Sequence, residues 1–80
     1  MNTPGTVYVS GKMIAATLDT GQTNAHRKIQ EAWRDHPRFK RRRHARVTIK
    51  EFADYWGYDL KEFVDQINLK CKMNIEYVTG

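Results

Sequence analysis

The sequence predicts one mainly α-helical domain built from four short helices in two pairs. Eighty residues are enough for a single domain with a modest core. Apolar residues recur at helical spacing in separate stretches, and residues typical of turns and helix caps lie between those stretches. Lysine and arginine are concentrated in the first half of the chain, which makes one part of the domain attractive to polyanions.

The first helix pair is predicted from a cap and an apolar stripe. Ser10 has the side chain of an N-cap for a helix over Gly11–Leu18. A second helix is predicted over about Gln22–Asp35, because its apolar residues recur on one helical stripe. These residues are Ala25, Ile29, Ala32 and Trp33. The segment Asp19–Thr23 has turn composition, and we expect Gly21 to supply a positive φ there.

The second helix pair begins with a capping box. Thr48 and Glu51 have the spacing of that motif, which predicts a third helix over Ile49–Trp56. Gly57 follows this helix and is expected to end it, because glycine readily takes the left-handed conformation found after helices.

A fourth helix and a terminal strand are predicted after it. Asp59 and Glu62 repeat the capping-box spacing and predict a helix through about Leu69. Apolar and polar residues then alternate over Met73–Val78, which favours a strand that pairs with Val7–Val9.

The two helix pairs also resemble each other in spacing. A shift of 38 residues places Ala15–Asp19 over Ala53–Gly57 and Ile29 over Ile67. Few residues are identical between the two stretches. An internal duplication and a coincidence of spacing therefore both stay open at this point.

Charge divides the chain into two parts. Residues 1–47 hold ten lysines and arginines against three acids, whereas residues 48–80 hold four lysines against six acids. The outer positions of the fourth helix include Asp59, Glu62 and Asp65, which DNA would repel. We therefore expect the second half to pack the core or contact a partner, and the first half to meet a polyanion.

The stretch Ala15–Ile29 resembles the helix-turn-helix family of DNA-binding proteins. That family's pattern runs through a small residue, a leucine, a turn, and a helix with an apolar and a basic residue. Its places are filled here by Ala15, Leu18, Asp19, Gly21, Asn24, Ala25, Arg27 and Ile29. Two places depart from the pattern, because Asp19 stands where the turn glycine is usual and Gly21 stands where a capping serine or threonine is usual.

The resemblance implies that the second helix enters a major groove with its outer side chains. Gln, Thr, His and Arg side chains suit base edges and phosphates. The expected contact residues on this helix are Gln22, Thr23, Asn24, His26, Arg27, Lys28, Gln30 and Arg34.

A basic segment follows directly. Its charges repel one another unless a polyanion offsets them, so we expect them to grip phosphates or reach a minor groove. They are Arg38, Lys40, Arg41, Arg42, Arg43 and Arg46. This position after the second helix is similar to that of the wing in winged helix-turn-helix proteins, which include excisionases of phages and mobile elements.

The fold class implied is mainly α, with four short helices as one or two helix-turn-helix units, a basic wing or loop and an optional terminal β-pairing. A single domain over 1–80 is expected to divide as follows: a loose N-terminus over 1–6, a DNA-reading unit over 10–36, a basic wing or arm over 37–47, a second unit over 48–70, and a tail or strand over 71–80.

The expected function is sequence-specific binding of double-stranded DNA, as a small transcriptional regulator or an excisionase-like recombination factor. A chain of this size covers limited DNA, so a homodimer or a cooperative array is expected for tight binding. Two alternatives stay open. One is a phage-type inhibitor that binds an acidic surface of a partner protein, and the other is RNA binding through the arginine-rich segment.

The sequence favours no catalytic or metal chemistry. Its histidines and its one cysteine lack zinc-ligand spacing, and no phosphate-binding glycine loop is present. We therefore expect no enzyme activity, no cofactor, no metal and no small-molecule substrate. There is neither a signal peptide nor a membrane-spanning apolar run, so the expected location is cytoplasmic, at the nucleoid if the source is bacterial.

Overall fold

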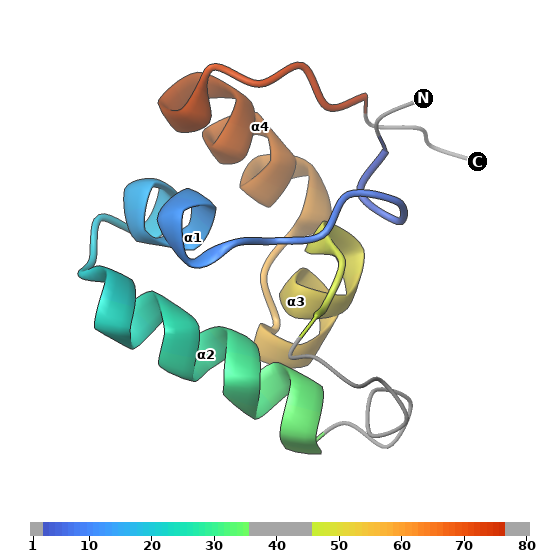
Figure 1. Cartoon of the computed structure of the whole chain (residues 1–80). Helices are drawn as coiled ribbons and strands as arrows, with labels where there is room; N and C mark the ends of the chain where they lie inside the picture. Colours follow the sequence, from blue (N-terminus) through green and yellow to red (C-terminus); the bar gives the residue numbers. More distant parts are fainter. Residues whose placement is uncertain (1–2, 36–45, 77–80) are drawn as a thin grey trace.

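The computed structural model describes residues 3–35 and 46–76, and it is mainly helical, as predicted. Its helices are α1 (Gly11–Leu18), α2 (Gln22–Asp35), α3 (Ile49–Trp56) and α4 (Leu60–Cys71). Figure 1 shows α1 lying across α2 and beside α4, with α3 between α2 and α4. The bounds of the first three helices agree with the sequence expectation, and α4 continues past the expected Leu69.

The helix starts are set by the predicted caps. The Ser10 hydroxyl accepts a hydrogen bond from the Met13 amide at 3.1 Å. Thr48 and Glu51 form a complete capping box, in which the Thr48 hydroxyl accepts from the Glu51 amide at 3.1 Å and the Thr48 amide donates to Glu51 Oε1 at 2.9 Å. The Asp59 carboxylate accepts from the Glu62 amide at 3.0 Å and begins α4.

The ends of α1 and α3 share one geometry. Gly57 ends α3 with φ of 77°, as predicted. At the end of α1 the left-handed residue is Asp19, with φ of 53°, and not Gly21 as we expected. Asp is one of the few residues other than glycine that tolerate this region, because its short polar side chain can bond locally.

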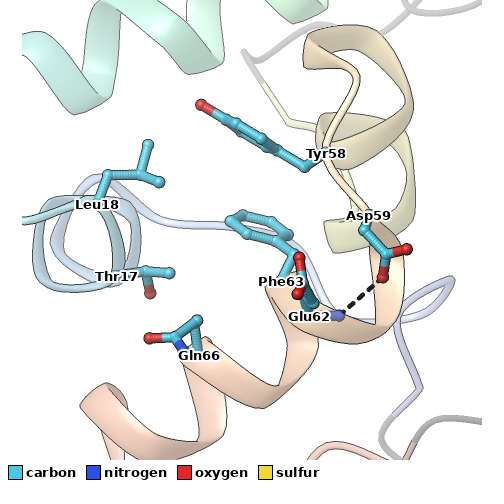
Figure 2. A pocket seen from close by; sticks show the side chains of 7 residues that line it. All are labelled: Thr17, Leu18, Tyr58, Asp59, Glu62, Phe63 and Gln66. Atoms are coloured by element: carbon cyan, nitrogen blue, oxygen red, sulfur yellow. Dashed lines mark hydrogen bonds between the residues drawn. The ribbon is translucent and has the colours of Figure 1, made fainter.

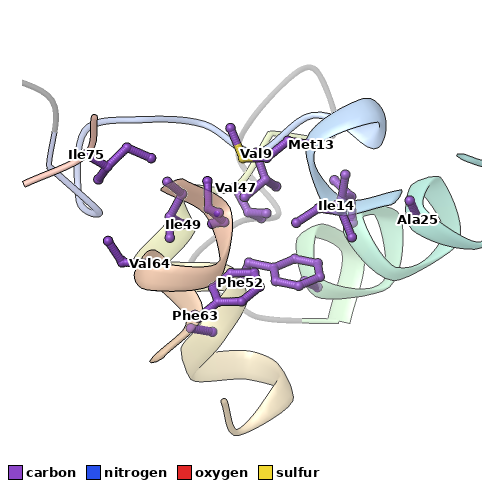
Figure 3. Close-up of a cluster of buried hydrophobic side chains, with 14 residues drawn as sticks. Val9, Met13, Ile14, Ala25, Val47, Ile49, Phe52, Phe63, Val64 and Ile75 are labelled. Atoms are coloured by element: carbon purple, nitrogen blue, oxygen red, sulfur yellow. The ribbon is translucent and has the colours of Figure 1, made fainter. Parts of the chain in front are cut away.

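The core gathers side chains from all four helices and from the segments before α1 and α3 (Figure 3). Its largest fully buried members are Phe52, Ile14, Ile49, Ile67, Val47 and Val64. The Phe52 ring stacks on Phe63 with centroids 5.6 Å apart and also meets Tyr58 at 6.1 Å. Aromatic contacts of this kind add to the free energy gained from burial alone.

A short antiparallel bridge joins the two helix pairs. Tyr8 pairs with Thr48, flanked by a hydrogen bond from the Val9 amide to the Val47 carbonyl and one from the Ile49 amide to the Val7 carbonyl, each 2.9 Å long. The predicted pairing of Val7–Val9 with the C-terminal tail is therefore wrong. The segment before α3 takes that place, and no sheet forms within the described residues.

The C-terminal segment is held by a side chain instead of a strand. The Asn68 amide group donates to the Ile75 carbonyl at 3.0 Å and accepts from the Ile75 amide at 2.9 Å. One side chain thus supplies the donor and the acceptor that a neighbouring strand would offer. Residues 73–76 have no regular structure, and the rest of the expected strand lies outside the described residues.

The start of the chain is more ordered than expected. Thr3 to Thr6 form a turn in which the Thr6 and Val7 amides donate to the Thr3 carbonyl at 3.0 and 3.1 Å. Pro4 is buried, and its carbonyl accepts from the Lys50 amide at 2.9 Å in the first turn of α3. This bond satisfies an amide that has no partner within its own helix.

The two helix pairs share one layout at a shift of 38 residues. Ser10 and Thr48 are the N-caps of α1 and α3, and Asp19 and Gly57 are their left-handed C-caps. The antiparallel bridge places Val9 opposite its own equivalent, Val47. The spacing seen in the sequence therefore corresponds to equivalent cap positions in two helix pairs, which meet at the antiparallel bridge.

Thr48 is predicted to be the most sensitive cap, because it serves α3 and the bridge together. Replacing Thr48 by Ala removes an acceptor from a nearly buried helix start and should lower the free energy of unfolding by about 1–2 kcal/mol. Denaturant unfolding measures this change. Thr48→Ser keeps the hydroxyl and should recover most of the loss; equal unfolding of the Ala and Ser variants would contradict the capping role.

Candidate nucleic-acid interface

One side of α2 carries most of the residues that the sequence predicts to contact DNA. Ala25, Ile29 and Ala32 are buried against the rest of the domain, which turns the opposite side of the helix to solvent. We call this side the outer face and define it by the exposed residues Gln22, Thr23, Asn24, His26, Arg27, Gln30 and Arg34; the acids Asp35, which is exposed, and Glu31, which is half-buried, also lie on this helix. All but Lys28 of the residues expected to contact DNA from this helix are thus exposed.

The N-terminus of α2 is open to an anion. Gly21 precedes the helix and has no side chain to cap it, and an added Cβ there would meet nothing within 4 Å. The first turn carries no acid. The hydroxyl of Thr20, the residue before Gly21, accepts a hydrogen bond from the Asn24 side chain at 3.3 Å. The first-turn amides of a helix have no partner within the helix, and the positive end of the helix dipole lies beside them, so a helix start of this kind favours negative charge.

Gly11 in the first turn of α1 lies close to the His26 side chain of α2. A Cβ added at this glycine would lie 2.4 Å from Nε2 of His26, which is far inside van der Waals contact. The His26 ring is therefore seated on the first turn of α1. The helix-turn-helix spacing predicted Ala15 as the small residue between the two helices and gave no signal for the contact between Gly11 and His26.

Lys28 lies apart from the outer face. Its Nζ is 4.1 Å from the centroid of the Trp56 ring, and the Trp56 indole donates to the Lys28 carbonyl at 3.3 Å. These two contacts tie the middle of α2 to the end of α3. A cation held over an indole face is stabilised by the ring's electrons, so we assign Lys28 to positioning α2.

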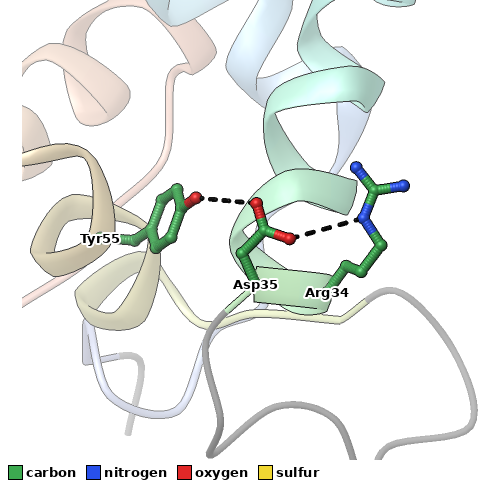
Figure 4. A network of polar contacts seen from close by, with 3 residues as sticks. All are labelled: Arg34, Asp35 and Tyr55. Atoms are coloured by element: carbon green, nitrogen blue, oxygen red, sulfur yellow. Dashed lines mark hydrogen bonds and ion pairs between the residues drawn. The ribbon is translucent and has the colours of Figure 1, made fainter.

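A polar network fixes the last turn of α2 (Figure 4). The Tyr55 hydroxyl donates to Asp35 Oδ2 at 3.3 Å, and Arg34 Nε lies 3.6 Å from Asp35 Oδ1. Partial desolvation, together with the negative charges of Glu31 and Asp35, raises the pKa of Tyr55. A phenol is protonated at neutral pH even without this shift, so the Tyr55 hydroxyl is available as a donor to Asp35.

Most of the basic segment lies outside the described residues, namely Arg38, Lys40, Arg41, Arg42 and Arg43. Arg46 is described and exposed, and its guanidinium carbon lies 5.1 Å from the centroid of the Tyr8 ring. The Tyr8 ring is itself 44% exposed. Sequence reasoning missed this pair, because Tyr8 and Arg46 become neighbours only through the bridge between Tyr8 and Thr48.

The second helix pair offers a different surface. A pocket of about 190 Å³ lies between the end of α1 and the start of α4, with Leu18, Tyr58 and Phe63 among its lining residues (Figure 2). Asp59 and Glu62 also line it, and no basic residue does. This surface is unsuited to a polyanion, as expected from the acids in this part of the sequence.

The described residues hold no cluster of three His, Cys, Asp or Glu side chains that could bind a metal ion. Of the helices that the structure describes, none combines the length and apolar content needed to cross a bilayer. No family model, curated protein or solved structure gives a significant match to this chain.

The contact between Gly11 and His26 generates a test. Gly11→Ala should push the His26 ring off α1, while the free energy of unfolding changes by less than about 1 kcal/mol, because alanine favours the helix and only a side-chain end must move. NMR should show displaced His26 ring resonances. In a His26→Ala background the same change should stabilise the domain, and an unmoved His26 ring would contradict the contact.

Proposed function

We propose that this chain binds double-stranded DNA in a sequence-specific manner, as a small transcriptional regulator or recombination factor. The observation that supports this most is the outer face of α2: seven exposed polar or basic residues on one helix whose N-terminus is free of a side-chain cap and of acids. Such a face has donors for base edges and for phosphates together.

The dimensions of α2 suit a major groove. Fourteen residues span about 21 Å at the rise of an α-helix. A groove about 12 Å wide admits one helix. In this proposal the N-terminal residues Gln22, Thr23 and His26 are closest to the bases, while Arg27 reaches a guanine edge. The α1 helix lies behind α2 and holds it at a fixed angle.

Electrostatics supports the same partner. The ten lysines and arginines of residues 1–47 face only three acids, and six of the ten lie between residues 38 and 46. In the proposal this segment follows α2 as a wing or arm and contacts phosphates on either side of the groove. Neutralising several phosphates makes the affinity fall steeply with salt.

Comparison of equivalent positions in the two helix pairs favours α2 over α4 as the helix that contacts DNA. At the shift of 38 residues, Arg27 of α2 corresponds to Asp65 of α4, and both side chains are exposed. A carboxylate at the equivalent place would repel the phosphate backbone. The proposal therefore gives DNA reading to α2 and leaves α4 to support the fold or to contact another protein.

Fluorescence anisotropy with labelled random duplex DNA tests the proposal. Binding should be measurable at 50 mM salt and should weaken by at least about tenfold at 200 mM salt. A matched titration with structured RNA separates the RNA alternative, which predicts tighter binding to RNA. No binding to either nucleic acid at low salt would contradict the proposal and favour an acidic protein partner.

Arg27 is predicted to determine sequence preference. After selection of a preferred site from a random duplex library, Arg27→Ala should lose about 1–3 kcal/mol of preference for that site and far less affinity for random DNA. Lys61→Ala is the matched control, because Lys61 is an exposed cation on α4, the helix equivalent to α2. A selected site still preferred as strongly by Arg27→Ala would exclude this role.

Arg42 is predicted to contribute affinity without preference. Arg42→Ala should weaken binding to selected and random duplexes by similar factors, and the slope of log affinity against log salt should become shallower by about one unit. Salt titrations of the variant and the parent protein measure this slope. A loss confined to the selected site would mean that Arg42 reads bases and does not contact phosphate.

A further inference from the structure

We propose that a groove between the start of α1 and the end of α4 binds a small amphipathic anion, with an apolar tail and a carboxylate-type head. The groove has a volume of about 480 Å³. Its lining residues are Ser10, Lys12, Met13, Ala16, Lys70, Cys71 and Met73. None belongs to the outer face of α2, so the inference does not depend on the proposed function.

The floor of the groove is apolar and adaptable. Met13 is buried and Met73 and Cys71 are half-buried, whereas Ala16, a small side chain, is an exposed member of the lining. The Cys71 thiol lies 3.7 Å from the Met13 carbonyl and 3.7 Å from the Thr17 hydroxyl, both in α1. Its polar hydrogen is thus satisfied within the fold. Thioether side chains rearrange readily around a flexible hydrocarbon chain.

The mouth of the groove is positive. Lys12 lies in the first turn of α1, and Lys70 lies in the last turn of α4. The first turn of α1 has no acid, so Lys12 adds positive charge to the positive end of the helix dipole. No carboxylate lines the groove to balance the two ammonium groups. An anionic head in the groove would offset the positive charge that Lys12 and Lys70 bring to its lining.

The extent of the apolar surface favours a small molecule over a protein. The volume lies within the range of about 300–1,000 Å³ that is usual for small-molecule sites. The large exposed apolar side chains of the described residues are Tyr8 and Leu69, and neither lines the groove. A protein partner would need an apolar surface that continues past the groove.

A set of ligands with one tail and three heads tests the proposal. Decanoate, decanol and decylammonium are titrated into isotope-labelled protein, and amide shifts are followed by NMR. Decanoate should saturate with shifts concentrated at residues 10–16 and 70–73. Decanol should bind about fivefold to tenfold more weakly and decylammonium more weakly still, because exposed charges contribute modest factors each.

Variants locate the tail and the head separately. Ala16→Phe fills the groove and should abolish binding of decanoate and decanol alike, with a retained spectrum as proof of folding. Lys12→Ser combined with Lys70→Ser should weaken decanoate about fivefold and leave decanol unchanged. Lys61→Ser is the control for general charge, because Lys61 is exposed at the other end of α4, and it should bind as the parent does.

A chemical readout supports the location. Saturating decanoate should slow the alkylation of Cys71 by a neutral maleimide in the parent protein. In the Ala16→Phe variant, decanoate should leave the alkylation rate unchanged. Equal affinity for the three heads, shifts centred away from the groove, or no saturable binding would overturn the proposal.

Discussion

The close crossing of α1 over α2 is the constraint on which the surface of this domain depends. The burial of Ala25, Ile29 and Ala32 fixes which side of α2 faces inward. The polar residues on the remaining side become one continuous face as a consequence. The chemistry proposed for α2 therefore follows from packing, because rotation of this helix would bury its basic residues at a high free-energy cost.

The second helix pair supports the first while carrying different charges. Trp56 and Tyr55 of α3 contact the middle and the end of α2 through Lys28 and Asp35. The bridge between Tyr8 and Thr48 joins the two pairs at their common starting segments. The two helix pairs thus have equivalent caps but differently charged surfaces. The first pair exposes a basic helix, whereas the second exposes carboxylates and contributes to the core.

Local signals in the sequence predicted the helices well, whereas contacts between distant residues could not be predicted from it. Ser10, Thr48 and Gly57 are caps whose effect is limited to the next few residues, so their helix ends were correct. The partner of Val7–Val9 was wrong, because alternation at the C-terminus does not reveal that Asn68 already satisfies Ile75. The exposed side of α2 followed from its apolar stripe, but the inward role of Lys28 depends on Trp56, which is distant in sequence.

An amide-shift map of the labelled protein with a short random-sequence duplex at low salt tests the central claim most directly. We expect the largest changes on the outer face of α2, at the amides of Gln22–Asn24, and in the stretch from residue 38 to Arg46. Changes centred on α4, or a spectrum that the duplex leaves unaltered, would contradict it.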